Sequence, residues 1–338
     1  MFPPVRSLVA LPVVWCGACA AEAPSGIGEP GAPTPRMAPG PYAPGRVYLG
    51  RNGYVEFRPG TLPLVISVPH DGTLRPTEIP DRTDGSRSAD ALVAAMAGYI
   101  SDTLATITGG RRPHFVFMRL HRIKLDANRD TVASGATGAY AAGVANGEYH
   151  SILDTAMALA HRQFGPAQHV DLHGNSHPQQ MIELGYGLGS ATLELSNAQL
   201  NSRPGLEDSS HVRVTSRRSP LSFAAFIRGS SSLGTLLANS GYVASPSAQT
   251  PSPGFSSFYG AVDHTGYTVR RHGCGILRRR PNPGDPTGQV CSVMMETPRS
   301  VGADTTVAAR KRFAGATARA LLAFLRAHYG YSPGAGGS

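Results

Sequence analysis

Two histidines follow apolar runs in this sequence, and their placement indicates metal chemistry. His70 comes directly after LPLVISVP, and His173 comes after HVDL and before Gly174. In open α/β sheets, ligands bind at the carboxyl ends of the strands, so both imidazoles are expected at one edge of a sheet. Two histidines and one carboxylate form a zinc site that keeps a position open for water. The pattern therefore predicts a hydrolytic Zn²⁺ site.

The third ligand of this site is expected to be a carboxylate, and we consider two acids of the segment that follows His70. We expect Asp90, at the start of a predicted helix, with Asp84 as the alternative. Taken singly, Asp90 is more typical of an acid at a helix N-terminus, and each histidine is more typical of an ordinary buried or surface imidazole. Asp171 is expected to face away from His173 and to have a supporting or structural role.

Three further segments carry groups that suit hydrolysis. Glu296 ends the apolar run VCSVMME, where a carboxylate could take a proton from an attacking water. Arg122 follows another such run, and its guanidinium suits a carboxylate or an oxyanion. The alternatives are a solvated acid at a strand end and a surface ion pair. Tyr267 and Arg271 lie in YGAVDHTGYTVRRHG, a segment whose polar groups could line a pocket.

The elements that would position these residues alternate between strand and helix. Strands are predicted at 62–69, 114–120, 169–172, 181–184 and 290–296, and helices from about 89, over 147–165 and over about 304–328. Continuous apolar runs are typical of strands that are buried on both faces. The order predicts an α/β fold with a mixed β-sheet that is flanked by helices on both faces. The segment 245–258 is expected to be a long functional or mobile loop.

The N-terminus reads as a signal peptide over residues 1–20. Arg6 supplies the positive charge, SLVALPVVWCGACA the apolar region, and Ala18-Cys19-Ala20 a cleavage site. This predicts a secreted or periplasmic protein, with a lipoprotein acylated on Cys19 as the alternative. A Pro/Gly/Ala-rich linker is expected over 21–45, a single domain over 46–331 and a flexible tail over 332–338.

Composition excludes some partners and favours a disulfide. The net charge is +9, but the arginines are scattered and no recognition motif accompanies them, so nucleic acid is not an expected partner. No later segment reaches 18 apolar residues, so no integral membrane segment is expected. Export would leave Cys274 and Cys291 in an oxidising compartment. A disulfide is expected there, with two buried free thiols as the alternative.

Four motifs in this order, VPHDG, RIKLDANRD, VDLHG and METP, resemble the N-formylglutamate amidohydrolase family. The resemblance runs from about Leu62 to Arg299. It implies the phosphorylase/hydrolase-like fold and the metal-site logic of zinc carboxypeptidases and aspartoacylases. It also implies that His70 and His173 are zinc ligands, Glu296 the general base and Arg129 the residue that recognises a carboxylate.

These observations predict a secreted zinc-dependent amidohydrolase. The substrate would be a carboxylate-bearing N-acyl amino acid or small peptide, contacted by Arg129, Asn128, Tyr267 and Arg271. Export distinguishes the chain from deformylases of histidine catabolism. Alternatives are a carboxypeptidase-like or cell-wall or poly-glutamate peptidase, a non-haem iron oxygenase with the same ligand types, and a non-catalytic envelope-binding module.

Overall fold

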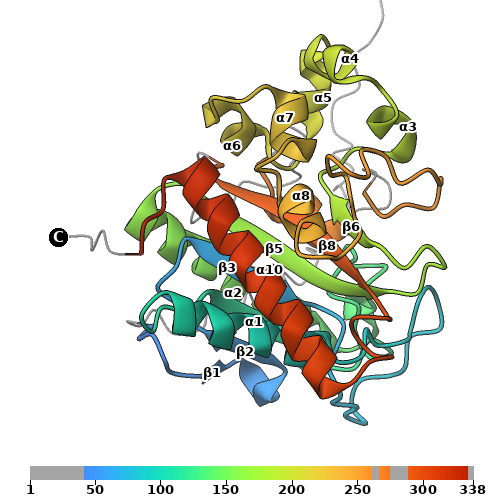
Figure 1. Cartoon of the computed structure of the whole chain (residues 1–338). Coiled ribbons are helices and arrows are strands. Elements are labelled where there is room, and N and C mark those ends of the chain that lie inside the picture. The colour runs from blue at the N-terminus through green and yellow to red at the C-terminus, as the bar shows by residue number, and fades with distance from the viewer. Residues whose placement is uncertain (1–41, 261–265, 275–287, 334–338) are drawn as a thin grey trace, which may run out of the picture. The chain divides into compact units, whose positions relative to one another are not determined.

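The computed structural model describes residues 42–260, 266–274 and 288–333. The predicted signal peptide, the linker up to residue 41 and the tail from residue 334 lie outside the described residues. Eight strands form one mixed sheet in the order β1-β2-β4-β3-β5-β8-β6-β7 (Figure 1). Helices cover both faces of this sheet, so the predicted α/β fold class is confirmed.

The centre of the sheet consists of four parallel strands. They are β4 (His114–Met118), β3 (Leu64–Val68), β5 (Ala167–Asn175) and β8 (Val290–Pro298). All residues of β3 and β8 are buried, which explains why these strands read as continuous apolar runs. The outer strands are β1 (Tyr48–Leu49), β2 (Val55–Arg58), β6 (Ile182–Gly185) and β7 (Ala244–Ser245). Of these, β2 runs antiparallel to β4, and β6 runs antiparallel to β8.

Three long helices cover the faces of the sheet. Alternate residues of a strand point to opposite faces. Accordingly, Leu64 and Ile66 pack with α1 (Val93–Ile107) and α10 (Val307–Tyr329), whereas Val65 packs with α2 (Tyr140–Phe164). Figure 1 shows α10 crossing the sheet in red. The sheet therefore has an α1/α10 face and an α2 face, each with its own apolar core.

On the α2 face, the strands β5 and β8 carry polar residues towards their carboxyl ends. Val170 and Leu172 belong to the α1/α10 core, so the residues between and after them, Asp171 and His173, point to the α2 face. Glu296 lies directly opposite His173 in the register of β5 and β8. The strand pattern thus places an imidazole and two carboxylates together on one buried face.

The described part of the chain also contains seven short α-helices, and the sequence did not predict them. Six lie between β6 and β7, and α9 precedes β8. They are α3 (Ser190–Leu193), α4 (Asn197–Asn201), α5 (Pro204–Ser209), α6 (Arg213–Arg218), α7 (Phe223–Arg228), α8 (Leu233–Ala238) and α9 (Tyr267–His272). None exceeds six residues, which is too short to show a helical period in the sequence.

The start of α1 differs from the prediction. The sequence predicted a helix from about residue 89, but the helix begins at Val93, and Leu92 directly before it is 40% exposed. Leu92 has a left-handed backbone conformation, with φ 67°. The carboxylate of Asp71 accepts hydrogen bonds from the backbone N–H groups of Leu92 (3.1 Å) and Ala94 (2.8 Å). A side chain from beyond β3 therefore caps this helix.

The expected disulfide is present and joins Cys274, after α9, to Cys291 in β8. Among the described residues, no helix is long and apolar enough to cross a membrane.

Three buried histidines predict that the protein loses stability in mild acid. Burial lowers the pKa of His114 to about 4, of His169 to about 3 and of His211 to about 4. Below the unfolded-state pKa of about 6.5, these histidines bind a proton in the unfolded chain but stay neutral in the native chain. Each of these histidines should therefore lower the free energy of unfolding by about 1.4 kcal/mol per pH unit between about pH 6.5 and its native pKa.

Denaturant unfolding of the wild type and of His114→Asn, measured from pH 7.5 to pH 4.5, checks this expectation. In the variant, the free energy of unfolding should fall less steeply with decreasing pH, by the contribution of about one proton. Equal slopes for the two proteins would show that His114 is not a buried neutral imidazole.

Candidate metal centre

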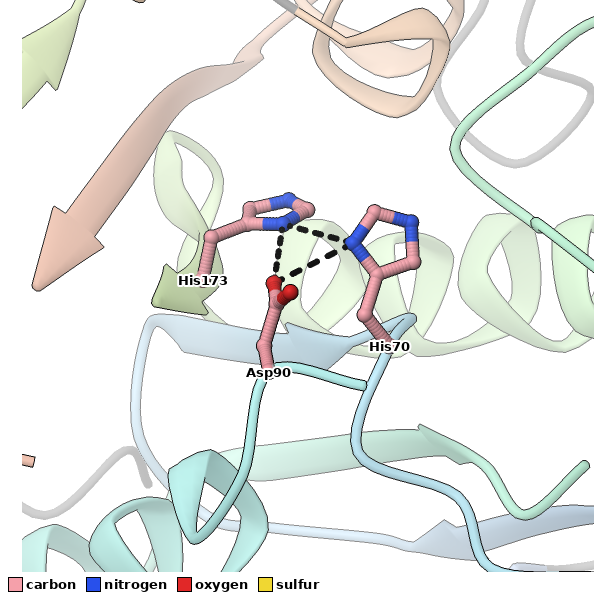
Figure 2. A group of neighbouring side chains, drawn as sticks. All are labelled: His70, Asp90 and His173. Atoms are coloured by element: carbon pink, nitrogen blue, oxygen red, sulfur yellow. Dashed lines mark hydrogen bonds and ion pairs between the residues drawn. The ribbon is translucent and has the colours of Figure 1, made fainter. Parts of the chain in front are cut away.

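His70, Asp90 and His173 lie together at the carboxyl ends of the parallel strands (Figure 2). The Nδ1 atom of His70 is 3.2 Å from Oδ2 of Asp90 and 3.1 Å from Nδ1 of His173. The Nδ1 atom of His173 is 3.3 Å from the same Asp90 oxygen. A tetrahedral Zn²⁺ with bonds of about 2.0–2.1 Å separates its ligand atoms by roughly 3.3 Å. These three side chains could therefore hold a metal ion.

The two acids that the sequence offered as third ligand have different surroundings. Asp90 donates its backbone N–H to the carbonyl oxygen of His70, at 3.1 Å, which holds it beside that ligand. Asp84 is exposed, and its carboxylate accepts a hydrogen bond from Thr83. Of the two, only Asp90 belongs to the group.

His70 and His173 each contact a different buried carboxylate through the second ring nitrogen, Nε2. Nε2 of His70 lies 2.7 Å from Asp126, and Nε2 of His173 lies 2.9 Å from Asp171. Pairs of this kind fix the orientation and tautomer of metal-binding imidazoles, leaving Nδ1 free to bind. The expectation that Asp171 faces away from His173 was wrong, because residues two apart in a strand share a face. Asp171 supports His173 directly.

Arg122 connects the two carboxylates around His70. Its Nε donates to Asp126 at 2.9 Å, and its Nη1 donates to Asp90 at 3.2 Å. Burial would lower the pKa of the Arg122 guanidinium, but Asp126 and Asp90 raise it above its ordinary value. Arg122 therefore remains charged and binds Oδ1 of Asp90, whereas the two histidines contact Oδ2.

The electrostatics of the group favour a positive charge at its centre. Burial alone would raise the pKa of Asp90, but His70 and His173 hold it well below its usual range. Burial would also lower the pKa of His173, yet Asp171, Asp90 and Glu296 raise it well above 6.5. A cation, whether a proton or a metal ion, is therefore stabilised between these side chains, which fits a metal site.

Glu296 lies beside the group at the end of β8. It is directly opposite His173 in β5 and directly opposite Glu183 in β6. Burial, Asp90 and Glu183 together raise the pKa of the Glu296 carboxyl to about 8, although His173 and Arg122 act in the other direction. In its ionised form, a carboxylate with a raised pKa is a stronger base than an ordinary glutamate, and a cation bound at the neighbouring group would favour that ionised form.

A cavity of about 280 Å³ opens next to Asp90 and Arg122. Its lining is mostly polar and contains hydroxyl, amide and guanidinium groups. The polar and aromatic lining residues are Ser86, Ser88, Asp90, Arg122, Asn175, Ser176, Tyr259, Thr297 and Arg299.

The predicted substrate-binding residues do not line this cavity. Asn128 lies between the site and α9: its Nδ2 is 3.3 Å from Nε2 of His173, and its Oδ1 accepts the backbone N–H of Thr268. Tyr267 packs edge-on against His150 of α2, and Arg271 lies 3.6 Å from Asp154 of the same helix. Arg129 is half-buried, and its Nη1 donates to the carbonyl of Asn128.

Three residues near the site form a contact group that the sequence did not predict. They are His177, Glu183 and Tyr259, which contact one another. Of the three, only Tyr259, the first residue of YGAVDHTGYTVRRHG, lines the cavity. The segment MIEL predicted the strand that contains Glu183, but only the pairing of β6 with β8 brings that acid opposite Glu296.

No protein-family model matches the sequence, and no curated protein matches it. Among solved structures, N-formylglutamate amidohydrolase from Ralstonia eutropha JMP134 is similar, with 17% identity and a TM-score of 0.42 over 84% of this chain and 97% of that chain. The N-acetylmuramyl-L-alanine amidase from Mycobacterium smegmatis is similar, with 15% identity and a TM-score of 0.33 over 78% and 96%. Similarities of this size do not identify a substrate for this chain.

Removing either candidate acid tests the ligand set. Asp90→Ala should lose the metal, because it removes one of three ligands, whereas Asp84→Ala should keep it, because Asp84 is exposed and outside the group. Elemental analysis of both purified variants beside the wild type, in which about one metal ion per chain is expected, gives the answer. Full metal occupancy in Asp90→Ala would contradict the assignment.

The role of Asp171 in orienting His173 can be tested without touching a ligand. Asp171→Asn keeps the shape of the side chain but removes the charge that holds Nε2–H. We expect a loss of about 10- to 100-fold in metal affinity, measured by competition with a chelator. Asp130→Asn, an exposed change that is outside the group, is the control. An unchanged affinity in Asp171→Asn would mean that the pair does not support metal binding.

Proposed function

We propose that this protein is a metal-dependent amidohydrolase, and that the metal is Zn²⁺. The observation that carries the proposal is the group of His70, Asp90 and His173, with the buried acid Glu296 next to it and a polar cavity beside it. Three protein ligands leave one tetrahedral position for water, as in hydrolytic zinc sites. The non-haem iron alternative has no use for a basic carboxylate at the position of Glu296.

The chain supplies the proton transfers of amide hydrolysis. A metal ion bound here would make a neighbouring water more acidic and polarise the substrate carbonyl. Glu296 takes a proton from the attacking water while a bond forms between the water oxygen and the carbonyl carbon. Glu296 then gives that proton to the amide nitrogen as the C–N bond breaks, so the products are a carboxylic acid and an amine.

Arg122 is proposed to stabilise the oxygen that becomes negatively charged. Its Nε and Nη1 are used by Asp126 and Asp90, which fix the plane of the guanidinium. Arg122 also lines the cavity, and its Nη2 makes no hydrogen bond to any residue that the structure describes. A donor held in advance is worth more to a transition state than one that must be ordered during the reaction.

The substrate is proposed to be a carboxylate-bearing N-acyl amino acid or small peptide. The motif resemblance assigns its carboxylate to Arg129, with Asn128, Tyr267 and Arg271 nearby. A second arginine, Arg299, lines the cavity and is paired with Asp304 through two contacts. Matched substrates that carry either a free carboxylate or its amide, tested on the metal-loaded enzyme, distinguish recognition of a carboxylate from recognition of the amide bond alone.

The protein is proposed to act outside the cytoplasm, in the periplasm or as a secreted enzyme. The disulfide between Cys274 and Cys291 is compatible with an oxidising compartment. The predicted signal peptide supports the same location.

Replacing the proposed base separates catalysis from metal binding. Glu296→Gln keeps the shape of the side chain and should keep the metal, since Glu296 is not one of the three ligands. We expect kcat to fall about 10²- to 10⁴-fold, the usual contribution of a positioned proton acceptor. Steady-state kinetics on N-acyl amino acids, with the metal content of each sample measured, provide the check. A metal-loaded variant with wild-type kcat would rule out Glu296 as the base.

A further inference from the structure

One residue that lines the cavity, Tyr259, belongs to a stacked pair of rings. Tyr259 lines the cavity together with Asp90 and Arg122. Its ring stacks on the imidazole of His177, with 4.5 Å between the ring centroids and an interplanar angle of 8°. A second ring, that of Phe255, lies nearly perpendicular to this imidazole, with 5.4 Å between the ring centroids. The tyrosine ring therefore has a defined plane.

A single buried carboxylate holds both members of the pair. Oε1 of Glu183 lies 2.6 Å from Nδ1 of His177, and Oε2 accepts the backbone N–H of Tyr259 at 2.8 Å. Glu183 has no solvent exposure and lies opposite Glu296 in the register of β6 and β8. Glu183 thus holds Tyr259, which lies 76 residues further along the sequence, next to β6, the strand that pairs with the end of β8 where Glu296 lies.

The hydroxyl of Tyr259 is available to a ligand as far as the described residues are concerned. It makes no hydrogen bond to any residue within the described parts of the chain, and the tyrosine is only half-buried. Burial, followed by the charges of Glu296 and Glu183, raises the pKa of this phenol above 10. The side chain thus remains a neutral hydrogen-bond donor throughout the physiological pH range, and it lies within electrostatic reach of the site.

We propose that Tyr259 is a further catalytic residue, whose hydroxyl donates a hydrogen bond to the substrate oxygen that becomes an oxyanion, and that Glu183 and His177 are positioning residues for it. The proposal rests on the proposed function. As the water oxygen bonds to the carbonyl carbon, the π electron pair moves to the carbonyl oxygen, and the phenol stabilises that charge without giving up its proton. The pair returns when the C–N bond breaks.

Tyr259→Phe tests the hydroxyl alone, because phenylalanine keeps the stack on His177. We expect kcat to fall about 10²-fold, the usual loss for one oxyanion donor, with KM and metal content nearly unchanged. Tyr242→Phe is the control, since Tyr242 packs against Phe313 of α10 and does not line the cavity. An unchanged kcat, or an effect on KM alone, would overturn the proposal.

A double-mutant cycle tests the positioning role of His177. His177→Ala removes the ring on which Tyr259 stacks, and as a single substitution it should lower kcat. In the Tyr259→Phe background, the same change should have almost no further effect, because the hydroxyl that it positions is already gone. Equal losses in both backgrounds would show that His177 acts independently of Tyr259. Circular dichroism and metal analysis of each variant separate this result from misfolding.

Two different failures can be distinguished. If the metal-loaded wild type hydrolyses no N-acyl amino acid or peptide, the proposed function fails and this inference falls with it. If the wild type is active and Tyr259→Phe matches its kcat, only the inference on Tyr259 is wrong.

Discussion

Buried carboxylates on the far nitrogens of His70 and His173 determine the geometry of the whole site. Asp126 and Asp171 hold these rings so that both Nδ1 atoms meet at the same Asp90 oxygen. Keeping three ionised carboxylates out of water costs several kcal/mol per ion unless positive charge lies close by. Arg122 supplies one such charge, and the centre of the group attracts another. The arrangement is therefore stable as a unit, and each of its members depends on the others.

The sheet explains how so many polar side chains can be buried at one place. In β5, the apolar residues Val170 and Leu172 pack in the α1/α10 core, while His169, Asp171 and His173 point to the α2 face. Within that face, His169 lies between Ser67 and Ser292, at 2.7 and 2.8 Å. These polar residues form hydrogen bonds with one another across neighbouring strands. The site lies where this row of polar residues reaches the carboxyl ends of the strands.

The sequence predicted the parts of this arrangement that follow from local pattern. Apolar runs identified β3, β4, β5 and β8, and the polar residues that end them identified His70, His173 and Glu296. The sequence favoured Asp90 as the third ligand and kept Asp84 as the alternative, because their segment has no periodicity. In the structure, a contact with the His70 backbone distinguishes the two acids. The contact of Glu183 with Tyr259 was equally invisible, because it joins residues 76 apart in the sequence, one in β6 and the other in the segment after β7.

The two ends of the sheet have a consequence for the behaviour of the protein in solution. The outermost strands, β1 and β7, are each only two residues long. A long exposed edge strand offers a row of unpaired backbone groups on which another chain can add a strand, and this is a common route to aggregation. Strands this short offer very few such groups. An eight-stranded sheet with a strongly apolar centre is thereby protected against edge-to-edge association with other molecules.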